Sequence, residues 1–285
     1  MSSMRLIVWN VGAGNSITCF TPNGKILQFD IGSSQDCSPL TELAKSFSTK
    51  VIDTLVITHP HGDHLRDIGA FKSCGITVKS ILRPKHLTDA EIKAANGKND
   101  DACVTQYLDL FKNYTDAVKT AESSLAKENN GGVVVRHFHP QNSAHSNINN
   151  HSIVTFLSYD GTKILAPGDC ESAGWNELLK DDDFKKELKG VTVLIAPHHG
   201  HANGYSSDVM KEIKPTLELV IVSDGKYNEK DSVTQYYSAM SKGHLVKNAT
   251  TKETKLAYCV TTRNNGWVDM VINSSGAAIT VSKGV

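Results

Sequence analysis

The chain has 285 residues, of which 39% are apolar and 21% are charged, so it is long enough for one large domain or two small ones. Lysine plus arginine number 30, aspartate plus glutamate also number 30, and the formal net charge is zero. This balance argues against a protein that grips long nucleic acid mainly through its overall charge, while a local basic rim stays compatible with it.

Signals for export or membrane insertion are missing from the sequence. The segment Met1–Trp9 lacks the apolar core and the cleavage site of a signal peptide, and no run of about 18 apolar residues is present. The six cysteines form no CxxC pair, which favours reduced core cysteines over a secreted disulfide framework. We therefore expect a cytoplasmic protein that does not associate with a membrane.

The first third of the chain alternates short apolar stretches with turns. Residues 22–24 read Pro-Asn-Gly, a hairpin signal, whereas the glycines at 12 and 14 lack the third glycine of a dinucleotide-binding loop and favour a tight turn. A helix is expected over 38–47 from the spacing of its apolar residues. Strands are predicted over 5–10, 16–21, 25–30, 53–58 and 76–83.

The most informative segment reads Thr-His-Pro-His-Gly-Asp-His at residues 58–64. It places His59, His61, Asp63 and His64 directly after a buried strand, where the sites of layered α/β proteins collect. Imidazole and carboxylate ligands suit zinc, manganese or iron, and no thiolate is needed. We interpret this segment as a metal site rather than a chance cluster of surface histidines.

Residues 88–130 have the period of a long amphipathic helix, because apolar residues recur every three or four positions as far as Leu125. The sequence Asn-Asn-Gly-Gly at 129–132 is expected to end it. We expect this helical insertion to cover a sheet, with a lid or a partner surface as the alternatives.

The second half continues to alternate strands and helices. Two of its strands end in groups that carry chemistry: Gly-Asp at 168–169, and Pro-His-His-Gly-His at 197–201. A β-meander is expected around 255–285, and the absence of repeats and linkers predicts a single domain over 1–285. The other strands are predicted over 133–138, 152–159, 163–166, 191–196 and 217–223, with helices over 171–188 and 231–240.

The order of these motifs resembles the metallo-β-lactamase superfamily, which has a strand-end Asp, HxHxDH, a later His, an Asp and a final His. The likeness extends from about residue 5 to residue 225, and it implies an α/β protein with a four-layer αββα sandwich. Four segments are also similar to the hydrolase domain of the competence protein ComEC and its stand-alone relatives: Asn10–Asn15, Asn149–Ser152, Ile164–Asp169 and Ala196–Gly200. That family commonly has Asp where Asn10 stands and Ser where His201 stands.

The resemblance implies a site for two divalent metal ions, with zinc as the first choice and manganese as the alternative. Asp30 would orient a ligand histidine from behind rather than bind metal. The implied ligands are His59 and His61 on the first ion, Asp63 and His64 on the second, Asp169 as the bridge, and His198 completing the second site.

The middle histidine of the superfamily has several candidates in the window before the Gly-Asp motif. The Asn-Asn-His-Ser match points to His151 or to the neighbouring Asn150, with His145 in reserve. His137 and His139 flank a phenylalanine on a predicted strand and are expected to face solvent.

Two metal ions about 3.5 to 4 Å apart acidify a bridging water and stabilise both oxygens of an in-line displacement. The chain is therefore expected to be a metal-dependent phosphodiesterase or nuclease that acts on DNA, RNA or a short or cyclic nucleotide. The alternatives are a non-nucleic hydrolase, such as a phosphorylcholine esterase or lactonase, and a non-catalytic metal-binding sensor module. The candidate catalytic residues are Asp63, His199 and His201, and the candidate substrate contacts are Asn10, Asn150 and Lys226.

Overall fold

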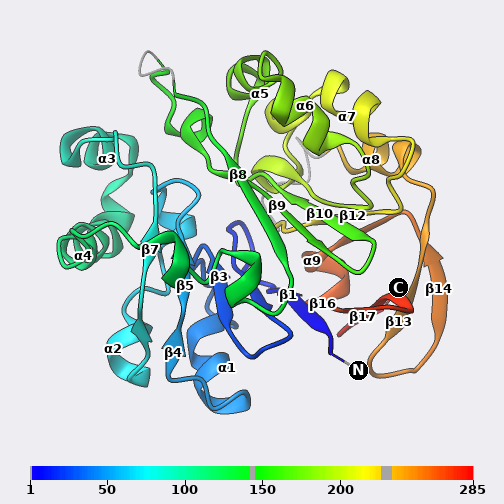
Figure 1. Cartoon of the computed structure of the whole chain (residues 1–285), viewed down its shortest axis with the longest axis horizontal. Helices are drawn as coiled ribbons and strands as arrows, with labels where there is room; N and C mark the ends of the chain where they lie inside the picture. Colours follow the sequence, from blue (N-terminus) through cyan, green and yellow to red (C-terminus); the bar gives the residue numbers. More distant parts are fainter. Residues whose placement is uncertain (1, 142–144, 226–232, 285) are drawn as a thin grey trace.

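The computed structural model describes residues 2–141, 145–225 and 233–284 and contains two large sheets that face each other (Figure 1). The nine-stranded sheet has the order β14 (Thr254–Ala257), β13 (His244–Asn248), β17 (Gly276–Val281), β16 (Val268–Asn273), β1 (Met4–Val8), β2 (Ile17–Phe20), β3 (Ile26–Phe29), β5 (Thr54–Val56), β7 (Ile81–Leu82). The six-stranded sheet has the order β15 (Cys259–Thr261), β12 (Leu219–Val222), β11 (Val193–Ile195), β10 (Thr162–Ala166), β9 (Val154–Tyr159), β8 (Val134–Phe138). A small separate sheet pairs β4 (Val51–Ile52) with β6 (Thr77–Val78).

Helices cover the outer face of each large sheet, which gives the four-layer αββα arrangement expected from the sequence (Figure 1). The nine-stranded sheet is covered by α1 (Pro39–Ser46), α2 (Ala70–Cys74), α3 (Asp89–Ala95) and α4 (Asp101–Phe111). The six-stranded sheet is covered by α5 (Ser172–Leu178), α6 (Asp182–Leu188), α7 (Ser207–Ile213) and α8 (Thr234–Met240). The short α9 (Thr262–Asn265) follows β15.

Strand periodicity explains why the core has three parts. On β1, Leu6 and Val8 pack into the layer between the two sheets, whereas Ile7 packs against the helices, because successive side chains of a strand point to opposite faces. On β9, Leu157 packs between the sheets and Phe156 packs against the helices. Both sheets are thus apolar on both faces, as expected for sheets covered on each side.

Parallel strands bring chemistry-bearing residues to one edge of the sandwich. β3, β5 and β7 are parallel neighbours in one sheet, and β10, β11 and β12 are parallel neighbours in the other. The carboxyl ends of parallel strands lie at the same edge, so Asp30, the 58–64 segment, Asp169 and the 197–201 segment meet there.

The prediction of one long helix over 88–130 is wrong. The structure has α3 and α4, and beyond Phe111 only two short 3-10 turns, η3 (Thr120–Glu122) and η4 (Lys127–Asn129). Asn96 ends α3, because its side-chain amide donates to the carbonyl of Pro60 and its oxygen accepts from Gly62 N. The break therefore serves to fasten α3 to the turn that carries the histidines.

Three further elements differ from the expectation. The helix predicted over 171–188 is divided into α5 and α6, because the Asp181 carboxylate accepts from the backbone of Asp183 and Phe184 and starts a new helix. The strand predicted over 76–83 is divided between β6 and β7, which lie in different sheets. The expected C-terminal meander is also incorrect, since β15 pairs in parallel with β12 of the six-stranded sheet while β16 and β17 form a hairpin in the other.

None of the helices in the described part of the chain is both long and apolar enough to cross a membrane. All six cysteines lie among the described residues as free thiols, with Cys19, Cys103 and Cys170 buried. Burial raises the pKa of Cys19 to about 12, so this thiol is unreactive near neutral pH.

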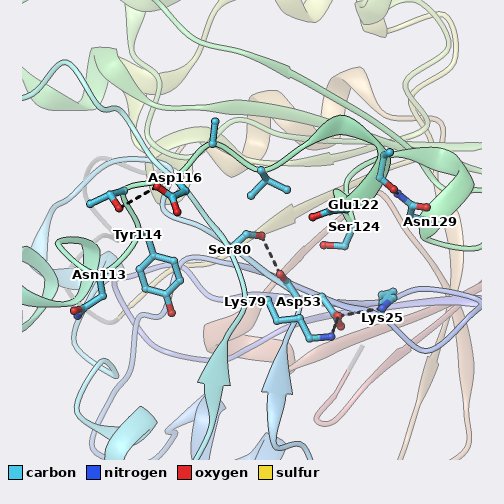
Figure 2. A pocket seen from close by; sticks show the side chains of 14 residues that line it. Lys25, Asp53, Lys79, Ser80, Asn113, Tyr114, Asp116, Glu122, Ser124 and Asn129 are labelled. Carbon is cyan, nitrogen blue, oxygen red and sulfur yellow. Dashed lines mark hydrogen bonds and ion pairs between the residues drawn. The ribbon is translucent and has the colours of Figure 1, made fainter.

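A cavity of about 610 Å³ lies at the start of β5, the opposite end of that strand from the 58–64 segment (Figure 2). Figure 2 shows the Asp53 carboxylate between two lysines, with its Oδ1 2.8 Å from Lys79 Nζ and 3.4 Å from Lys25 Nζ. Asp116 and Glu122 also line the cavity, so its two lysines are more than balanced by carboxylates. The charge of this cavity does not favour a phosphate group.

Candidate metal centre

Four ligand-type side chains converge where the two sheets share an edge. One atom from each of Asp63, His64, Asp169 and His199 lies within 4.8 Å of the other three. Asp63 and His64 belong to η1 (Gly62–His64) after β5, whereas Asp169 follows β10 and His199 lies in η6 (Pro197–Gly200) after β11. Each sheet therefore supplies half of the group.

Asp169 lies between two sets of histidines. Its Oδ1 is 3.2 Å from His64 Nε2, and its Oδ2 is 3.3 Å from His199 Nε2. The same Oδ2 is 3.9 Å from His59 Nε2, which in turn lies 3.0 Å from His61 Nδ1. A single buried carboxylate thus contacts both the group with Asp63 and the His59–His61 pair, as a bridging ligand must.

The strained backbone of the 197–201 segment directs His199, rather than His198, into the group. His198 and His199 both have positive φ angles, of 47° and 52°, which non-glycine residues rarely adopt and which cluster at functional sites. The turn directs His199 Nε2 to within 3.3 Å of Asp63 Oδ2 as well as Asp169. His198 instead places Nδ1 3.1 Å from Glu171 Oε1, with Nε2 3.8 Å from Asp169 Oδ2. The sequence assigned the final ligand of this group to His198, but the structure brings His199 into it.

Asp30 lies behind His64 and fixes which of its nitrogens faces the group. It is fully buried, has a φ of 53°, and its Oδ2 accepts a hydrogen bond from His64 Nδ1 at 2.7 Å. Thr58 donates to Asp30 from both its backbone N and its hydroxyl, and Asn15 donates from its amide. The charged acceptor holds a proton on Nδ1, so Nε2 is the nitrogen of His64 that faces Asp169 and becomes available to a metal ion once its own proton is released.

Other acceptors stand behind two more histidines. His199 Nδ1 donates to the carbonyl of Ser223 at 3.1 Å, and His59 Nδ1 lies 3.4 Å from Ser152 Oγ. His64 Nε2 and His199 Nε2 are buried and make no hydrogen bond of regular geometry within the described residues. Buried inward-facing nitrogens beside carboxylates, each with an acceptor on its outer nitrogen, fit divalent metal ions with nitrogen and oxygen ligands.

Two glycines allow the Asp63 backbone to approach the first strands. A Cβ at Gly14 would lie 2.6 Å from the Asp63 carbonyl oxygen, and one at Gly32 would clash with the same atom. The tight turn expected at Gly12 and Gly14 thus presses against the metal-site turn. A side chain at either position would force the Asp63 backbone or the glycine-bearing segment to shift.

Charge divides the histidines into two classes. Burial is the main cause that lowers the pKa of His59 and of His61, so both rings are neutral. Burial also opposes protonation of His64 and His199, but nearby carboxylates outweigh it, raising the pKa of His64 well above its usual value and that of His199 to about 10. Protons on these two rings occupy the place of a cation among Asp63, Asp169 and Asp30.

The candidates for the middle histidine lie elsewhere. His151 Nδ1 is 2.8 Å from His86 Nε2, and His151 Nε2 donates to the His145 carbonyl at 2.9 Å. The side-chain oxygen of Asn150 accepts from Gly174 N and so fastens α5. Neither residue is brought into the metal group; the next residue along the chain, Ser152, contacts it instead.

The remaining predicted residues have mixed positions. Asn10 is half-buried and lies two residues beyond the end of β1. Because β1 and β3 run in the same direction, Asn10 lies at the same edge of the sheet as Asp30. His201 is half-buried with its ring centroid 4.9 Å from that of His198. His137 does not simply face solvent, because its Nδ1 hydrogen-bonds the Thr155 hydroxyl. Lys226 lies outside the described residues.

Sequence reasoning missed three supporting residues. Ser152 contacts His59 and also accepts from Asp169 N, Glu171 pairs with His198, and Ser223 holds His199 through its carbonyl. Glu171 follows Asp169 by two residues, and Ser223 comes directly after β12, which was the available signal. A backbone carbonyl, however, leaves no trace in residue identity.

Two facing sheets, helices on both outer faces, and an HxHxDH turn meeting a Gly-Asp and a His-His-Gly turn at one edge define the metallo-β-lactamase fold. No protein-family model and no curated protein sequence matches the chain.

Several solved structures are similar to this chain. One is a diphosphatase of the PhnP family, with 12% sequence identity and a TM-score of 0.44 over 83% of this chain and 91% of that chain. Another is a proposed metallo-β-lactamase from Thermotoga maritima, with 16% identity and a TM-score of 0.39 over 65% of this chain and 90% of that chain. A long form of RNase Z from yeast is also similar, with 10% identity and a TM-score of 0.39 over 94% of this chain and 42% of that chain.

Proposed function

We propose that this chain is a metal-dependent hydrolase with a two-ion centre built around Asp169. The observation that carries this proposal is the position of that carboxylate, whose two oxygens face His64, His199 and His59 within 4 Å. A buried carboxylate surrounded by imidazoles is costly to maintain unless a cation neutralises it. Its retention at the edge where sites of this kind of scaffold form supports a catalytic centre.

The ligands divide into two sets that share Asp169. One ion is assigned to Asp63, His64 and His199. The other is assigned to His59 and His61, and His198 is its third histidine ligand, in the role that the resemblance gave to the middle histidine of the superfamily. His198 Nε2 and His59 Nε2 face the same Asp169 oxygen, at 3.8 and 3.9 Å, and Glu171 stands behind the His198 ring as an acceptor. The nitrogen and carboxylate set suits zinc, with manganese as the alternative.

Bound divalent ions would supply an acidified water and positive charge for the oxygens of the substrate. The protein's own residues do the positioning. Asp30 and the Ser223 carbonyl hold His64 and His199 in fixed tautomers. His201 is partly open to solvent, with its ring centroid 4.9 Å from that of His198, and is the proposed donor of a proton to the leaving oxygen.

For the substrate we propose a phosphodiester in a nucleotide or nucleic acid. The Asn149–Ser152, Ile164–Asp169 and Ala196–Gly200 segments, which resemble competence-type hydrolases, support this choice. Zero net charge favours short or cyclic nucleotides over long polymers, which are bound largely through basic surfaces.

The test uses metal-free protein reloaded with Zn²⁺ or Mn²⁺ and assayed on bis-p-nitrophenyl phosphate and on single- and double-stranded DNA. His61→Ala is the inactive variant, and His244→Gln is the control, because His244 lies on β13 and pairs with Glu218 away from the centre. We expect metal-dependent turnover that His61→Ala abolishes and His244→Gln preserves. Firm metal binding without phosphodiester cleavage would overturn the substrate proposal in favour of a lactonase-like hydrolase or a sensor module.

A further inference from the structure

An exposed aromatic side chain lies near the turn that carries His198 and His199. The Tyr236 side chain on α8 is 53% exposed, and its ring centroid lies 5.9 Å from that of Tyr205, with 48° between the two ring planes. The Tyr205 ring lies in turn 5.4 Å from the fully buried ring of Tyr237. Tyr205 and Tyr237 pack with the helices that cover the six-stranded sheet, whereas Tyr236 is open to solvent.

The segment that ends at Tyr205 is fastened to the 197–201 turn. Gly204 N donates to the His201 carbonyl at 3.1 Å. A Cβ at Gly204 would lie 2.8 Å from the Pro197 carbonyl oxygen, so the backbone just before Tyr205 packs directly against the start of the turn. The position of Tyr205 is therefore set by the same turn that brings a histidine into the metal group.

The direction of α8 places Tyr236 at the metal-centre end of this helix. Val233 comes directly before α8, and its N donates to the Gly200 carbonyl at 3.0 Å. At the other end of the helix, the Ser241 hydroxyl donates to the carbonyl of Glu218, which comes directly before β12. Tyr236 is in the first turn of α8 and so lies closer to the Gly200 end. Both tyrosines thus belong to the rim of the Asp169 centre.

We propose that Tyr236, supported from behind by Tyr205, stacks on a nucleobase of the substrate, an inference that rests on the proposed function. Stacking on tyrosine strengthens the binding of nucleotides without demanding one base, because every base has an aromatic face. Tyr205 and Tyr237 already supply the aromatic packing behind α8, so the core does not require the exposed ring. A stacking surface also provides affinity that a chain of zero net charge does not gain from overall attraction to phosphates.

This position separates recognition of the base from the chemistry. His198 and His199 face Asp169, whereas Tyr236 lies beyond the turn that carries them. A base stacked on Tyr236 would therefore belong to a nucleotide beside the linkage that is cleaved. Because paired bases are already stacked within a duplex, such a surface favours single-stranded or unpaired substrates.

The test compares two fluorescein-labelled hexanucleotides that carry the same phosphates, namely hexadeoxyadenylate and a hexamer of abasic sites. Stopped-flow fluorescence anisotropy with Zn²⁺-loaded protein records binding before any cleavage. The variants are Tyr236→Leu, which removes the aromatic ring, and Tyr236→Phe, which keeps it. Because Tyr236 is exposed, both changes are compatible with folding. Tyr258→Leu is the matched control, since Tyr258 is 44% exposed and comes directly before β15, at the opposite end of that strand from the metal-centre edge.

We expect wild type, Tyr236→Phe and Tyr258→Leu to bind hexadeoxyadenylate at least about fivefold more tightly than the abasic hexamer. Tyr236→Leu should bind the two hexamers alike. Equal binding of both by wild type, binding of neither, or a preference that survives in Tyr236→Leu would overturn the proposal. Failure of the proposed function is a separate result, because it is seen as absence of metal-dependent cleavage of bis-p-nitrophenyl phosphate, whereas the preference for bases is measured without turnover.

Discussion

The two nitrogens of His64 face two carboxylates on opposite sides: Nδ1 lies 2.7 Å from Asp30 Oδ2, and Nε2 lies 3.2 Å from Asp169 Oδ1. Asp30 is surrounded by three further donors and cannot rotate away, so the ring is held between the inner strand end and the metal group. The tautomer of His64 is therefore a property of the fold rather than of the ion.

Replacing Asp30 should test that relationship. In Asp30→Asn, an amide N–H would meet the donors of Thr58 and His64, so we expect zinc affinity to fall about 10- to 100-fold and stability to decrease. Isothermal titration calorimetry and thermal unfolding of the metal-free form measure the two effects. The control is Asp53→Asn, since Asp53 is also a nearly buried carboxylate but lies at the other end of β5. Wild-type zinc affinity in Asp30→Asn would show that His64 needs no such support.

The choice between neighbouring histidines can be tested by metal content. His199→Ala should lose the ion assigned to Asp63 and His64, because His199 Nε2 lies 3.3 Å from both carboxylates of that set. His198→Ala should retain this ion and weaken the one at His59 and His61. Co²⁺ absorption spectra of the two variants, titrated in steps, separate the ions. If only His198→Ala loses the Asp63 ion, the assignment drawn from the sequence is right and this one is wrong.

Metal binding should release protons. Carboxylates raise the pKa of His64 above its usual value and that of His199 to about 10 against the effect of burial, so the metal-free centre is protonated at pH 7. An ion must displace these protons, and zinc affinity should rise about tenfold per pH unit for each proton released. Calorimetry at pH 7 in buffers of different ionisation enthalpy should find about two protons per pair of ions, whereas a buffer-independent heat would contradict the protonated state.

A buried carboxylate outside the metal group should control stability near pH 5. Burial raises the pKa of Asp67 to about 6, although it accepts from Leu40 N and the Ser38 hydroxyl. Because the folded pKa exceeds the unfolded value of about 3.9, this group's contribution is complete below pH 4 and is lost as pH rises through 6.

The neutral variant Asp67→Asn can keep both contacts, since an amide accepts from Leu40 N and donates to the Ser38 oxygen. We expect it to be more stable than wild type at pH 7 by up to about 3 kcal/mol and to lose this advantage at pH 4. Denaturant unfolding at the two pH values checks the prediction. An advantage that does not change with pH would place the cause in packing rather than ionisation.

Local patterns were enough to predict the centre's outline. The strand before His59, the acidic strand end at Asp30 and the Gly-Asp turn at Asp169 depend on short-range sequence. The four-layer order was expected only from the resemblance to the metallo-β-lactamase superfamily. The choice of His199 over His198 was not accessible, because it depends on two consecutive positive φ angles set by packing against the Ser223 strand end.

Periodicity failed where tertiary contacts override it. Residues 112–130 keep helical spacing, yet the Tyr114 hydroxyl donates to the Val78 carbonyl and Ser124 hydrogen-bonds Thr54, so this segment follows the sheet instead of coiling. His151 was chosen for its motif, but a carbonyl of its own loop and His86 fix its ring elsewhere. Such partners are distant in sequence and cannot be inferred from one chain alone.

The division of the centre between the two sheets affects when an ion can be held. During synthesis, the ligand residues at 59–64 emerge from the ribosome roughly 100 residues before Asp169, and His199 emerges later still. An early ion would have only the first segment to bind, and it would exchange freely until the second sheet has formed. Retention of metal would thus report that both halves of the sandwich have closed, and ions held by ligands from both sheets would stabilise the folded chain by binding it in preference to the unfolded one.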